Sequence, residues 1–360
     1  MGMKLLVTGG SGFLGRRTAA YFEELGWQVL APSHEALDIT DETGVFRYFR
    51  ENRPDAVIHT AAVSDTGLCQ RDPAWSEKIN VDGCGNLAKA CHCFGAKPVF
   101  CSSDQVYFRS PAPGPHRETD ILTPGNVYGD QKLRAEQIWL EICPETVCLR
   151  LSWMYSRQDL PNQHGHFLAT LKAAMADESK ILTYPVYDRR GLTDAADVVK
   201  NLPKALKLPG GVWNFGSEND KNTYETVQSV LEELDLEAVN RLQPNLDAFA
   251  DHPRDISMDL SKLAAAGINA MVINMPTIKP LDEELVIAAA KKCGKVITCE
   301  EHSVIGGLGE AVCSFLSENY PTPVKRIGVD DQFGFSGPAA EVLKAFGLCA
   351  DHIVEVTKEF

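Results

Sequence analysis

A tyrosine and a lysine four residues apart, Tyr128 and Lys132, are the side chains whose spacing most directly suggests chemistry. On a helix, this spacing places both on one face. A phenol with its ordinary pKa of ~10 is a poor acid–base group at neutral pH, and we expect the neighbouring ammonium to lower that pKa. Ser103 follows an apolar run and supplies a hydroxyl for the oxygen that gains or loses the proton. On an arbitrary helix such a pair is usually just exposed, so the surrounding elements decide its role.

A glycine cluster near the N-terminus follows a short apolar run, Leu5–Val7, and precedes a helix-like segment, residues 16–25. Gly10, Gly12 and Gly15 fit G-x-G-x-x-G, and Thr8-Gly9-x-x-Gly12-x-x-Gly15 fits a second spacing. Strand, glycine turn and helix in this order set backbone N–H groups and a helix N-terminus against a pyrophosphate. Glycine lets the backbone turn tightly and approach the phosphates. We therefore predict that this turn binds a dinucleotide, whose oxidised nicotinamide ring would also favour the phenolate of Tyr128.

Apolar runs alternate with amphipathic stretches over residues 1 to about 150. The expected strands are Lys4–Thr8, Gln28–Ala31, Ala56–Thr60, Pro98–Ser102 and Thr146–Leu151. The expected helices are Arg16–Leu25, Glu42–Asn52, Trp75–Cys93 and Tyr128–Ile142. Nearly continuous hydrophobic strands between helices indicate a parallel sheet covered on both faces, a Rossmann-type doubly wound α/β fold. In this fold Ser103 ends a strand and Tyr128 begins a later helix, an order that chance seldom assembles.

Residues 151 to about 265 are more mixed and predict a small lobe that closes over a substrate. This part contains a Pro- and Gly-rich turn, a short apolar run and a helix candidate, at Leu208–Gly211, Val212–Phe215 and Thr223–Leu234. From about residue 268 a second, partial α/β unit begins, with no flexible linker before it. Its expected strands are Ala270–Met275, Lys295–Cys299, Pro323–Val329 and His352–Val356, and its expected helices are Asp282–Lys292, Gly307–Glu318 and Gly337–Phe346. The predicted domains are therefore 1–265 and 268–360.

Composition narrows the classes of function. The 360 residues carry a net charge of −14, which argues against nucleic acid as the main partner because phosphate backbones attract basic surfaces. We expect no membrane association, because no uncharged apolar run could span a bilayer, and the N-terminus has no secretory pattern. The eleven cysteines are expected to be reduced thiols in the cytosol. Cys91-His92-Cys93 has no second pair at zinc-finger spacing and His164-Gly165-His166 is expected to be a polar loop, so we expect no metal site.

The motifs TGGSGFLG (8–15), SSDQVY (102–107) and YGDQK (128–132) together resemble those of the extended short-chain dehydrogenase/reductases. Within these, residues 3 to about 265 most resemble the dTDP-4-dehydrorhamnose reductase group. The resemblance implies NAD(P)H-dependent reduction of a keto group on a nucleotide-linked sugar. It makes Ser103, Tyr128 and Lys132 the catalytic triad, with Tyr128 donating the proton and Lys132 also holding the nicotinamide ribose. It implies a cofactor site made of Gly9, Gly12, Phe13, Leu14, Gly15, Arg16, Asp38, Ile39, Ala61 and Ala62, together with Tyr128 and Lys132.

The choice of cofactor can be argued from charge. NAD-specific sites usually carry an acidic residue at the end of the second strand, where it binds the ribose 2′-OH. Here that region is Ala31-Pro32-Ser33-His34, and Glu35 comes slightly late. Arg16 and Arg17 could meet a 2′-phosphate. NADP(H) is therefore favoured, with NAD(H) left open.

Two residues of the predicted lobe are candidates for substrate contacts. Trp153 is expected to stack on a base or sugar, although a core position is an equal alternative, and Arg190 is expected to pair with a diphosphate. The Asn-Ala-Ala of the family is replaced by His59-Thr60-Ala61-Ala62. The loop after it also lacks the acidic pattern of the rhamnose enzymes, so the sugar is left unassigned.

Residues 268 to 360 resemble the C-terminal domain of transketolase-type proteins. The likeness lies in INAMVINMPTIKPLDEELVIAAAKKCGKVITCEEHSVIGGLGEAV (268–312) and PVKRIGVDDQFGFSGPAAEVLKAFGL (323–348). It indicates a fusion joined around residues 263–267. The diphosphate-and-metal motif of thiamine enzymes does not occur in this sequence, so transketolase chemistry is not expected. Glu300, Glu301 and His302 are expected at a strand end, in a region that serves subunit contacts in the relatives.

Three classes of function stay open. The complete triad favours a reductase, whose partner is a nucleotide-sugar substrate and whose assembly could be a homodimer. A non-catalytic dinucleotide-binding regulatory subunit is the alternative, and another dehydrogenase or epimerase activity of the same family is a further one. A thiamine-dependent transferase component is a weaker third hypothesis.

Overall fold

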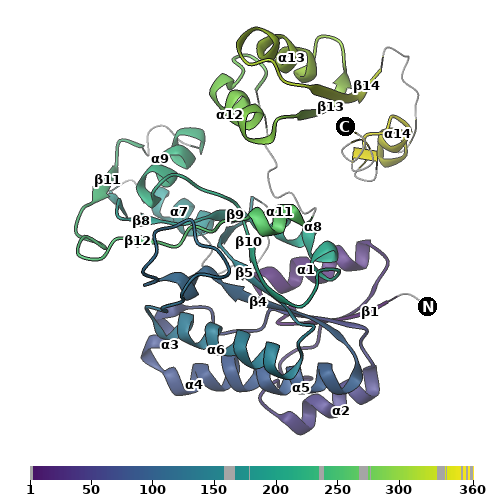
Figure 1. The fold of residues 1–360 in the computed structure, drawn as a ribbon, viewed down its shortest axis with the longest axis vertical. Coiled ribbons are helices and arrows are strands. Elements are labelled where there is room, and N and C mark those ends of the chain that lie inside the picture. The colour runs from purple at the N-terminus through teal and green to yellow at the C-terminus, as the bar shows by residue number, and fades with distance from the viewer. Residues whose placement is uncertain are drawn as a thin grey trace. The chain divides into compact units, whose positions relative to one another are not determined.

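The computed structural model describes residues 3–157, 167–177, 179–234, 239–266, 275, 277–330, 337, 339–349, 352–353, 356 and 360. The chain forms two compact units, Met1–Met271 and Val272–Phe360 (Figure 1). Each unit has its own hydrophobic cluster. No helix in the described part of the chain is both long enough and apolar enough to cross a membrane.

The first unit is built on a six-stranded sheet with the order β10-β5-β4-β3-β1-β2, and every pairing in it is parallel. Its strands are β1 (Lys4–Thr8), β2 (Gln28–Leu30), β3 (Ala56–His59), β4 (Lys97–Ser103), β5 (Val147–Leu151) and β10 (Gly211–Phe215). β3 and β5 are buried along their whole length. This is the expected signature of strands covered on both faces, and the doubly wound α/β fold is confirmed.

Helices cover both faces of this sheet (Figure 1). One face carries α1 (Phe13–Glu24), α8 (Ala195–Ala205) and α11 (Ser261–Ala265), and the other carries α2 (Glu42–Asn52), α5 (Gly83–Phe94) and α6 (Val127–Ile142). Phe22 and Leu202 are fully buried in the first layer, and Phe49 and Trp139 are fully buried in the second. Burying each such side chain contributes about 1.5–3 kcal/mol, so both helix layers are held by apolar contact with the sheet.

The chain reverses direction across the sheet between β1 and β3. From β1 it passes to β2 on one side, and it then returns to pair β3 on the other side of β1, with Thr8 opposite His59. In open α/β sheets, the carboxyl ends of the strands at such a switch point form the ligand crevice. The glycine turn leaves β1 at this place.

The helix expected over residues 75–93 is divided into three segments. α4 (Pro73–Glu77) is followed by a π-helical segment, Lys78–Asp82, and then by α5. Before them lies α3 (Thr66–Arg71), which was not predicted. The π segment carries the buried Asn80, whose amide nitrogen donates to Gln131 of α6 at 2.9 Å. π-Helical turns of this kind are found mostly at functional sites, and this one faces the helix of Tyr128.

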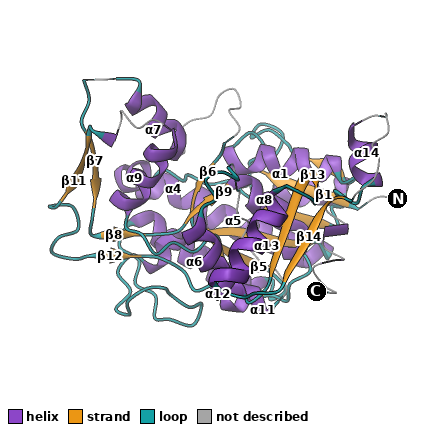
Figure 2. Ribbon diagram, turned by 90° about the horizontal axis from the view of Figure 1, so that it is seen from above, coloured by secondary structure: helices purple, strands orange, loops and turns teal. Residues whose placement is uncertain are grey.

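The lobe of the first unit has a cluster of its own, which includes Leu171, Leu182 and Leu231. It consists of α7 (Phe167–Met175), β7 (Leu182–Pro185), α9 (Thr223–Leu234) and β11 (Leu242–Asn245), with β7 and β11 paired in parallel (Figure 2). Two short pairings join lobe segments: β6 (Trp153–Tyr155) with β9 (Leu192–Asp194), and β8 (Asp188–Arg189) with β12 (Arg254–Asp255). The predicted helix over 223–234 is confirmed.

The second unit pairs β13 (Val296–Ser303) in parallel with β14 (Val324–Val329). α12 (Glu283–Cys293) and α13 (Leu308–Asn319) pack together around Ala290 and Leu316, and α14 (Ala339–Ala345) follows them. The strand predicted over 352–356 is wrong for its described residues, because residues 352, 353 and 356 are helical. The strand predicted over 270–275 lies outside the described residues, except for Met275, which is in no strand.

Glu300 in β13 stabilises the fold of the second unit. The Glu300 carboxylate accepts the backbone N–H groups of Leu308 and Gly309 at 2.6 and 2.8 Å. It therefore caps the first turn of α13, where the helix dipole favours negative charge. Glu301 and His302 follow near the end of the strand and are exposed.

Candidate active site

The glycine turn after β1 fits a dinucleotide by its lack of side chains. Gly9 has φ of +71°, and a Cβ on it would lie 2.7 Å from the backbone nitrogen of Ala61. A Cβ on Gly15 would overlap the carbonyl oxygen of Gly9. α1 begins at Phe13, its N-cap Gly12 supplies no side-chain cap, and its first turn contains no acidic residue. A helix N-terminus that begins at a glycine and has no acidic residue in its first turn suits a phosphate.

The predicted cofactor residues that follow β2 and β3 differ in their burial. Asp38 is half-buried, and hydrogen bonds from Thr40 hold the pKa of its carboxyl below the usual value. Ile39 is buried. Its side chain packs against Gly83, where an added Cβ would lie 2.8 Å from the isoleucine. Ala61 and Ala62 are half-buried directly after β3. Ile39 therefore faces the core, and only its backbone is left to face a cofactor.

The two arginines after the glycine turn differ in their contacts. The Arg16 guanidinium donates to the carbonyl of Ser11 at 3.0 Å and stays on the turn. Arg17 is buried; it donates to the carbonyl of Phe13 at 2.7 Å, and its guanidinium lies 4.4 Å from the centroid of the Phe13 ring. Arg16 therefore lies along the glycine turn, whereas Arg17 packs against Phe13.

The structure brings Ser103, Tyr128 and Lys132 together. Ser103 ends β4, Tyr128 lies in the first turn of α6, and all three side chains are buried. The Ser103 hydroxyl is near enough to the Tyr128 phenol to lower the pKa of the phenol. The ammonium of Lys132 lies 5.7 Å from the centroid of the Tyr128 ring and donates to the carbonyl of Cys101 at 2.8 Å.

The side chains of Asn126 and Gln105 position the start of α6. The Asn126 side chain caps the helix by accepting the N–H of Gly129 at 2.8 Å, and its amide donates to the Gln105 side chain at 3.0 Å. A Cβ on Gly129 would lie 2.6 Å from the carbonyl oxygen of Gln105. Glycine at this position lets α6 contact the 3₁₀ turn Asp104–Tyr107 directly. The Asn126 cap was visible in the sequence as a helix start, whereas the contact with Gln105 depends on tertiary packing.

The pKa of the Tyr128 phenol moves in the direction opposite to the expected one. Burial raises it above the ordinary value, the negative charge of Asp104 raises it further, and the Ser103 hydroxyl opposes them. Burial also lowers the pKa of the Lys132 ammonium. The expectation that the lysine makes the phenol more acidic is therefore wrong for the protein groups alone, because desolvation of the phenolate is the larger effect. Tyr128 is a protonated phenol at neutral pH, which is the form a proton donor requires.

The two candidate substrate residues contact each other beside Ser103. The Arg190 guanidinium lies 4.7 Å from the centroid of the Trp153 ring and pairs with the buried carboxylate of Asp104 at 3.2 Å. Trp153 also meets Phe167 edge-to-face at 4.7 Å. The Nε of Arg190 is buried and has no hydrogen-bond partner among the described residues. A buried donor without a partner costs about 1–3 kcal/mol, and an acceptor on a ligand would remove that cost.

A buried ion pair holds α6 one turn beyond Lys132. Glu136 accepts from the Arg150 guanidinium at 2.7 and 3.0 Å and from the Ser102 hydroxyl at 2.5 Å, and both charged side chains are 2% exposed. Arg150 also donates to the hydroxyl of Tyr107 at 2.7 Å, and Tyr107 donates to the Asn214 side chain at 2.8 Å. This network joins α6 to β4, β5 and β10, so the strand that carries Ser103 and the helix that carries Tyr128 are held together.

His59 links the glycine turn to the interior beneath Lys132. It is buried, its Nδ1 lies 2.6 Å from the Thr8 hydroxyl, and its Nε2 lies 3.3 Å from the Cys84 sulfur. Burial, with a smaller effect of the Lys132 charge, lowers the pKa of His59 to about 3. His59 is therefore neutral at physiological pH and is not a proton shuttle.

This histidine predicts an acid-sensitive fold. Because the folded state keeps His59 neutral, its contribution to stability is present above pH ~6.5 and is lost as the pH falls from ~6.5 towards 3. We expect about 2 kcal/mol to be lost between pH 6.5 and 4.5, measured by urea unfolding. His59→Asn should flatten this dependence, and His252→Asn, at an exposed histidine, should not. An equal slope in the wild type and His59→Asn would contradict the assignment.

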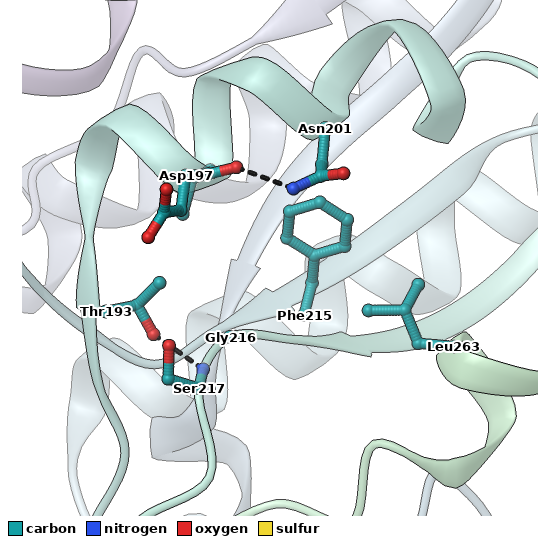
Figure 3. A pocket seen from close by; sticks show the side chains of 8 residues that line it. Thr193, Asp197, Asn201, Phe215, Gly216, Ser217 and Leu263 are labelled. Atoms are coloured by element: carbon teal, nitrogen blue, oxygen red, sulfur yellow. Dashed lines mark hydrogen bonds between the residues drawn. The ribbon is translucent and has the colours of Figure 1, made fainter. Parts of the chain in front are cut away.

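A small pocket beside α8 is not the substrate site (Figure 3). Asn201 donates to the carbonyl of Asp197 at 2.9 Å on one side, and the N–H of Ser217 donates to the Thr193 hydroxyl at 2.7 Å on the other. Counted as space for the centre of a water molecule, its volume is about 10 Å³. That is room for one water molecule. In the described part of the chain, no three His, Cys, Asp or Glu side chains gather as a metal site would require.

Comparison with known proteins agrees with this geometry. The model of the RmlD substrate binding domain matches residues 3–274. The dTDP-4-dehydrorhamnose reductase of Streptomyces griseus is 30% identical over 280 residues, which cover 74% of this chain and 88% of that protein. Methionine adenosyltransferase 2 subunit beta of Pongo abelii is 27% identical over 281 residues, which cover 74% of this chain and 83% of that protein.

Solved structures share the fold. The dTDP-4-dehydrorhamnose reductase of Bacillus anthracis, in complex with NADP, matches with a TM-score of 0.67 at 23% identity, covering 75% of this chain and 94% of that one. The UDP-glucose 4-epimerase of Thermus thermophilus, in complex with NAD, matches with a TM-score of 0.61 at 25% identity, covering 76% of this chain and 95% of that one. These structural relatives bind NADP or NAD.

The C-terminal segment has separate relatives. The transketolase C-terminal domain model matches residues 260–353. The 6-deoxy-6-sulfo-D-fructose transketolase subunit SqwH of a Clostridium species is 48% identical over 98 residues, which cover 27% of this chain and 30% of that protein. The chain therefore belongs to the RmlD substrate binding domain family of extended short-chain dehydrogenase/reductases, and it carries a transketolase C-terminal domain segment at its C-terminal end.

Proposed function

We propose that the protein is an NAD(P)H-dependent reductase of a keto group on a nucleotide-linked sugar. The observation that carries this proposal is the buried set of Ser103, Tyr128 and Lys132. The positive charge of Lys132 lowers the pKa of His59, and His59 contacts Thr8 at the start of the glycine turn. The triad is thereby connected to the crevice where a dinucleotide fits.

Each residue of the triad has a distinct proposed role. Bound on the glycine turn, a reduced nicotinamide supplies a hydride to the carbonyl carbon of the sugar. Tyr128 donates its phenolic proton to the carbonyl oxygen, because burial keeps that proton on the phenol at neutral pH. Lys132 holds the nicotinamide ribose, and the Ser103 hydroxyl donates a hydrogen bond to the carbonyl oxygen that receives the proton. General acid catalysis of this kind contributes about 10²–10⁴-fold to the rate.

The preferred cofactor and substrate follow from the charges around this set. NADP(H) is supported by Arg16 on the glycine turn and by the absence of an acidic residue at the end of β2, a described segment. A nucleoside diphosphate sugar is supported by Arg190 beside Trp153, because its buried Nε has no hydrogen-bond partner among the residues that the structure describes. The dTDP-linked 4-keto sugars are the first substrates to test, because one relative is named for such a reaction. The cysteines are all free thiols, which supports a reducing compartment such as the cytosol.

The proposal is tested by ligand stabilisation followed by turnover. A thermal-shift screen of nucleoside diphosphate sugars with NADPH present should raise Tm for the true ligand, because a ligand that binds only the folded state stabilises it by mass action. Each ligand that raises Tm is then assayed, as its 4-keto derivative, for NADPH oxidation. Stabilisation by NADPH without turnover of any keto sugar would contradict the reductase.

That contrary outcome would support a second candidate. One relative, whose match covers 74% of this chain at 27% identity, is named as a subunit of methionine adenosyltransferase. A dinucleotide-binding regulatory subunit would bind NADPH and give no turnover. The buried triad favours the reductase.

A further inference from the structure

Gln131 directly precedes Lys132 on α6, and the proton transfer described above gives it no role. Its side chain is 1% exposed. The amide nitrogen donates to the carbonyl of Pro73 at 3.1 Å and to the Ser76 hydroxyl at 2.9 Å. The amide oxygen accepts from the side chain of Asn80 at 2.9 Å. One buried side chain thereby joins α6 to α4 and to the π-helical segment Lys78–Asp82.

These partners determine which end of each amide faces which neighbour. A backbone carbonyl such as that of Pro73 can only accept a hydrogen bond. The Ser76 hydroxyl has one proton, which it gives to the backbone carbonyls at the start of α4, so towards Gln131 it is an acceptor. Gln131 must therefore turn its nitrogen to α4 and its oxygen to Asn80. Asn80 in turn must present its nitrogen to Gln131.

Asn80 passes this orientation on to the loop after β3. Because its nitrogen faces Gln131, its oxygen accepts the backbone N–H of Val63 at 2.8 Å, and its second amide proton goes to the Val63 carbonyl at 3.1 Å. The Asn80 amide thus holds both backbone polar groups of one loop residue. Val63 is buried in a cluster with Tyr128 and directly follows Ala62, a predicted cofactor residue.

We propose that Gln131 is a positioning residue of the cofactor site: through Asn80 it holds Val63 and the loop after β3 beside the nicotinamide half of the bound dinucleotide. This inference rests on the proposed function for the cofactor that the loop serves. The hydride leaves the nicotinamide next to the proton donor, so a loop that packs on Tyr128 borders that half. Without the Gln131 oxygen, a buried amide proton of Asn80 has lost its acceptor, which is costly. Asn80 then gains by turning, and the turn releases Val63.

The test compares the binding of NADPH with that of adenosine 2′,5′-bisphosphate, which lacks the nicotinamide half. Gln131→Met keeps the length of the side chain and removes its hydrogen bonds. By calorimetric titration we expect it to weaken NADPH binding about tenfold and to leave the affinity for the bisphosphate unchanged. Gln70→Met, at an exposed glutamine of α3, is the matched control and should change neither affinity. If Gln131 only supports the fold, Gln131→Met lowers Tm and changes both affinities equally or neither, and either result overturns the inference.

A double-mutant cycle tests whether Gln131 acts through Asn80. Asn80→Leu removes the hold on Val63 directly and should also weaken the binding of NADPH but not of the bisphosphate, a result that stands even if Gln131→Met does not fold. Adding Gln131→Met to Asn80→Leu should then weaken NADPH binding no further, because both changes break one path. Effects that multiply in the double variant contradict that path. These measurements need binding alone, so a protein that binds NADPH and turns over no keto sugar loses the reductase function and keeps this inference.

Discussion

Replacing Tyr128 by phenylalanine is expected to lower kcat for keto-sugar reduction by about 10³-fold. The ring stays, so packing around the 9% exposed side chain is kept. The change removes the one proton that the phenol can give to the carbonyl oxygen. NADPH binding should persist, because the glycine turn and Lys132 are unchanged. The measurement is NADPH oxidation under saturating substrate, with NADPH affinity determined separately by fluorescence.

Tyr48→Phe provides the control for this loss. Tyr48 lies on α2, half-buried, and its side-chain oxygen has no part in the proposed site. This variant should keep the wild-type kcat. Comparable activity in Tyr128→Phe and wild type would remove Tyr128 from the chemistry, and a parallel loss of NADPH affinity would instead assign it to cofactor binding.

Replacing Gly9 by alanine is expected to abolish measurable NADPH binding and to destabilise the fold by several kcal/mol. Two costs add at this position. The φ of +71° disfavours any residue with a Cβ by about 1–2 kcal/mol, and that Cβ would lie 2.7 Å from the backbone nitrogen of Ala61. A backbone atom cannot move aside as a flexible side chain can. The shift would therefore displace the turn from the end of β3, where the phosphates are proposed to bind.

Gly26→Ala separates these two costs. Gly26 has a similar φ of +80°, but a Cβ there would meet nothing within 4 Å. This control should cost about 1–2 kcal/mol and leave NADPH affinity unchanged. Unfolding in urea gives the stability of each variant, and titration with NADPH gives the affinity. Equal effects of the two substitutions would mean that the close approach to Ala61 has no part in binding.

Local pattern was sufficient for most of the first unit. β1 and α2 have the bounds predicted from the sequence, because a buried parallel strand is nearly all apolar and a surface helix repeats its apolar positions every three to four residues. The expected helix over 75–93 begins earlier, at Pro73, because Asp72 caps α4 by accepting the N–H of Trp75, and it contains the π-helical segment because Asn80 is drawn to Gln131 on another helix. That second cause is a tertiary contact, which periodicity does not register.

The sequence by itself determined which residues carry the proposed chemistry and the order of the elements that hold them. Glycine spacing and the tyrosine–lysine interval are local features, and they persist whatever packs around them. Only the tertiary structure decided the protonation of Tyr128, the burial of Ile39 and Arg17, and the meeting of Arg190 with Asp104. Those properties depend on desolvation and on charges brought together from distant parts of the chain, and neither exists until the chain is folded.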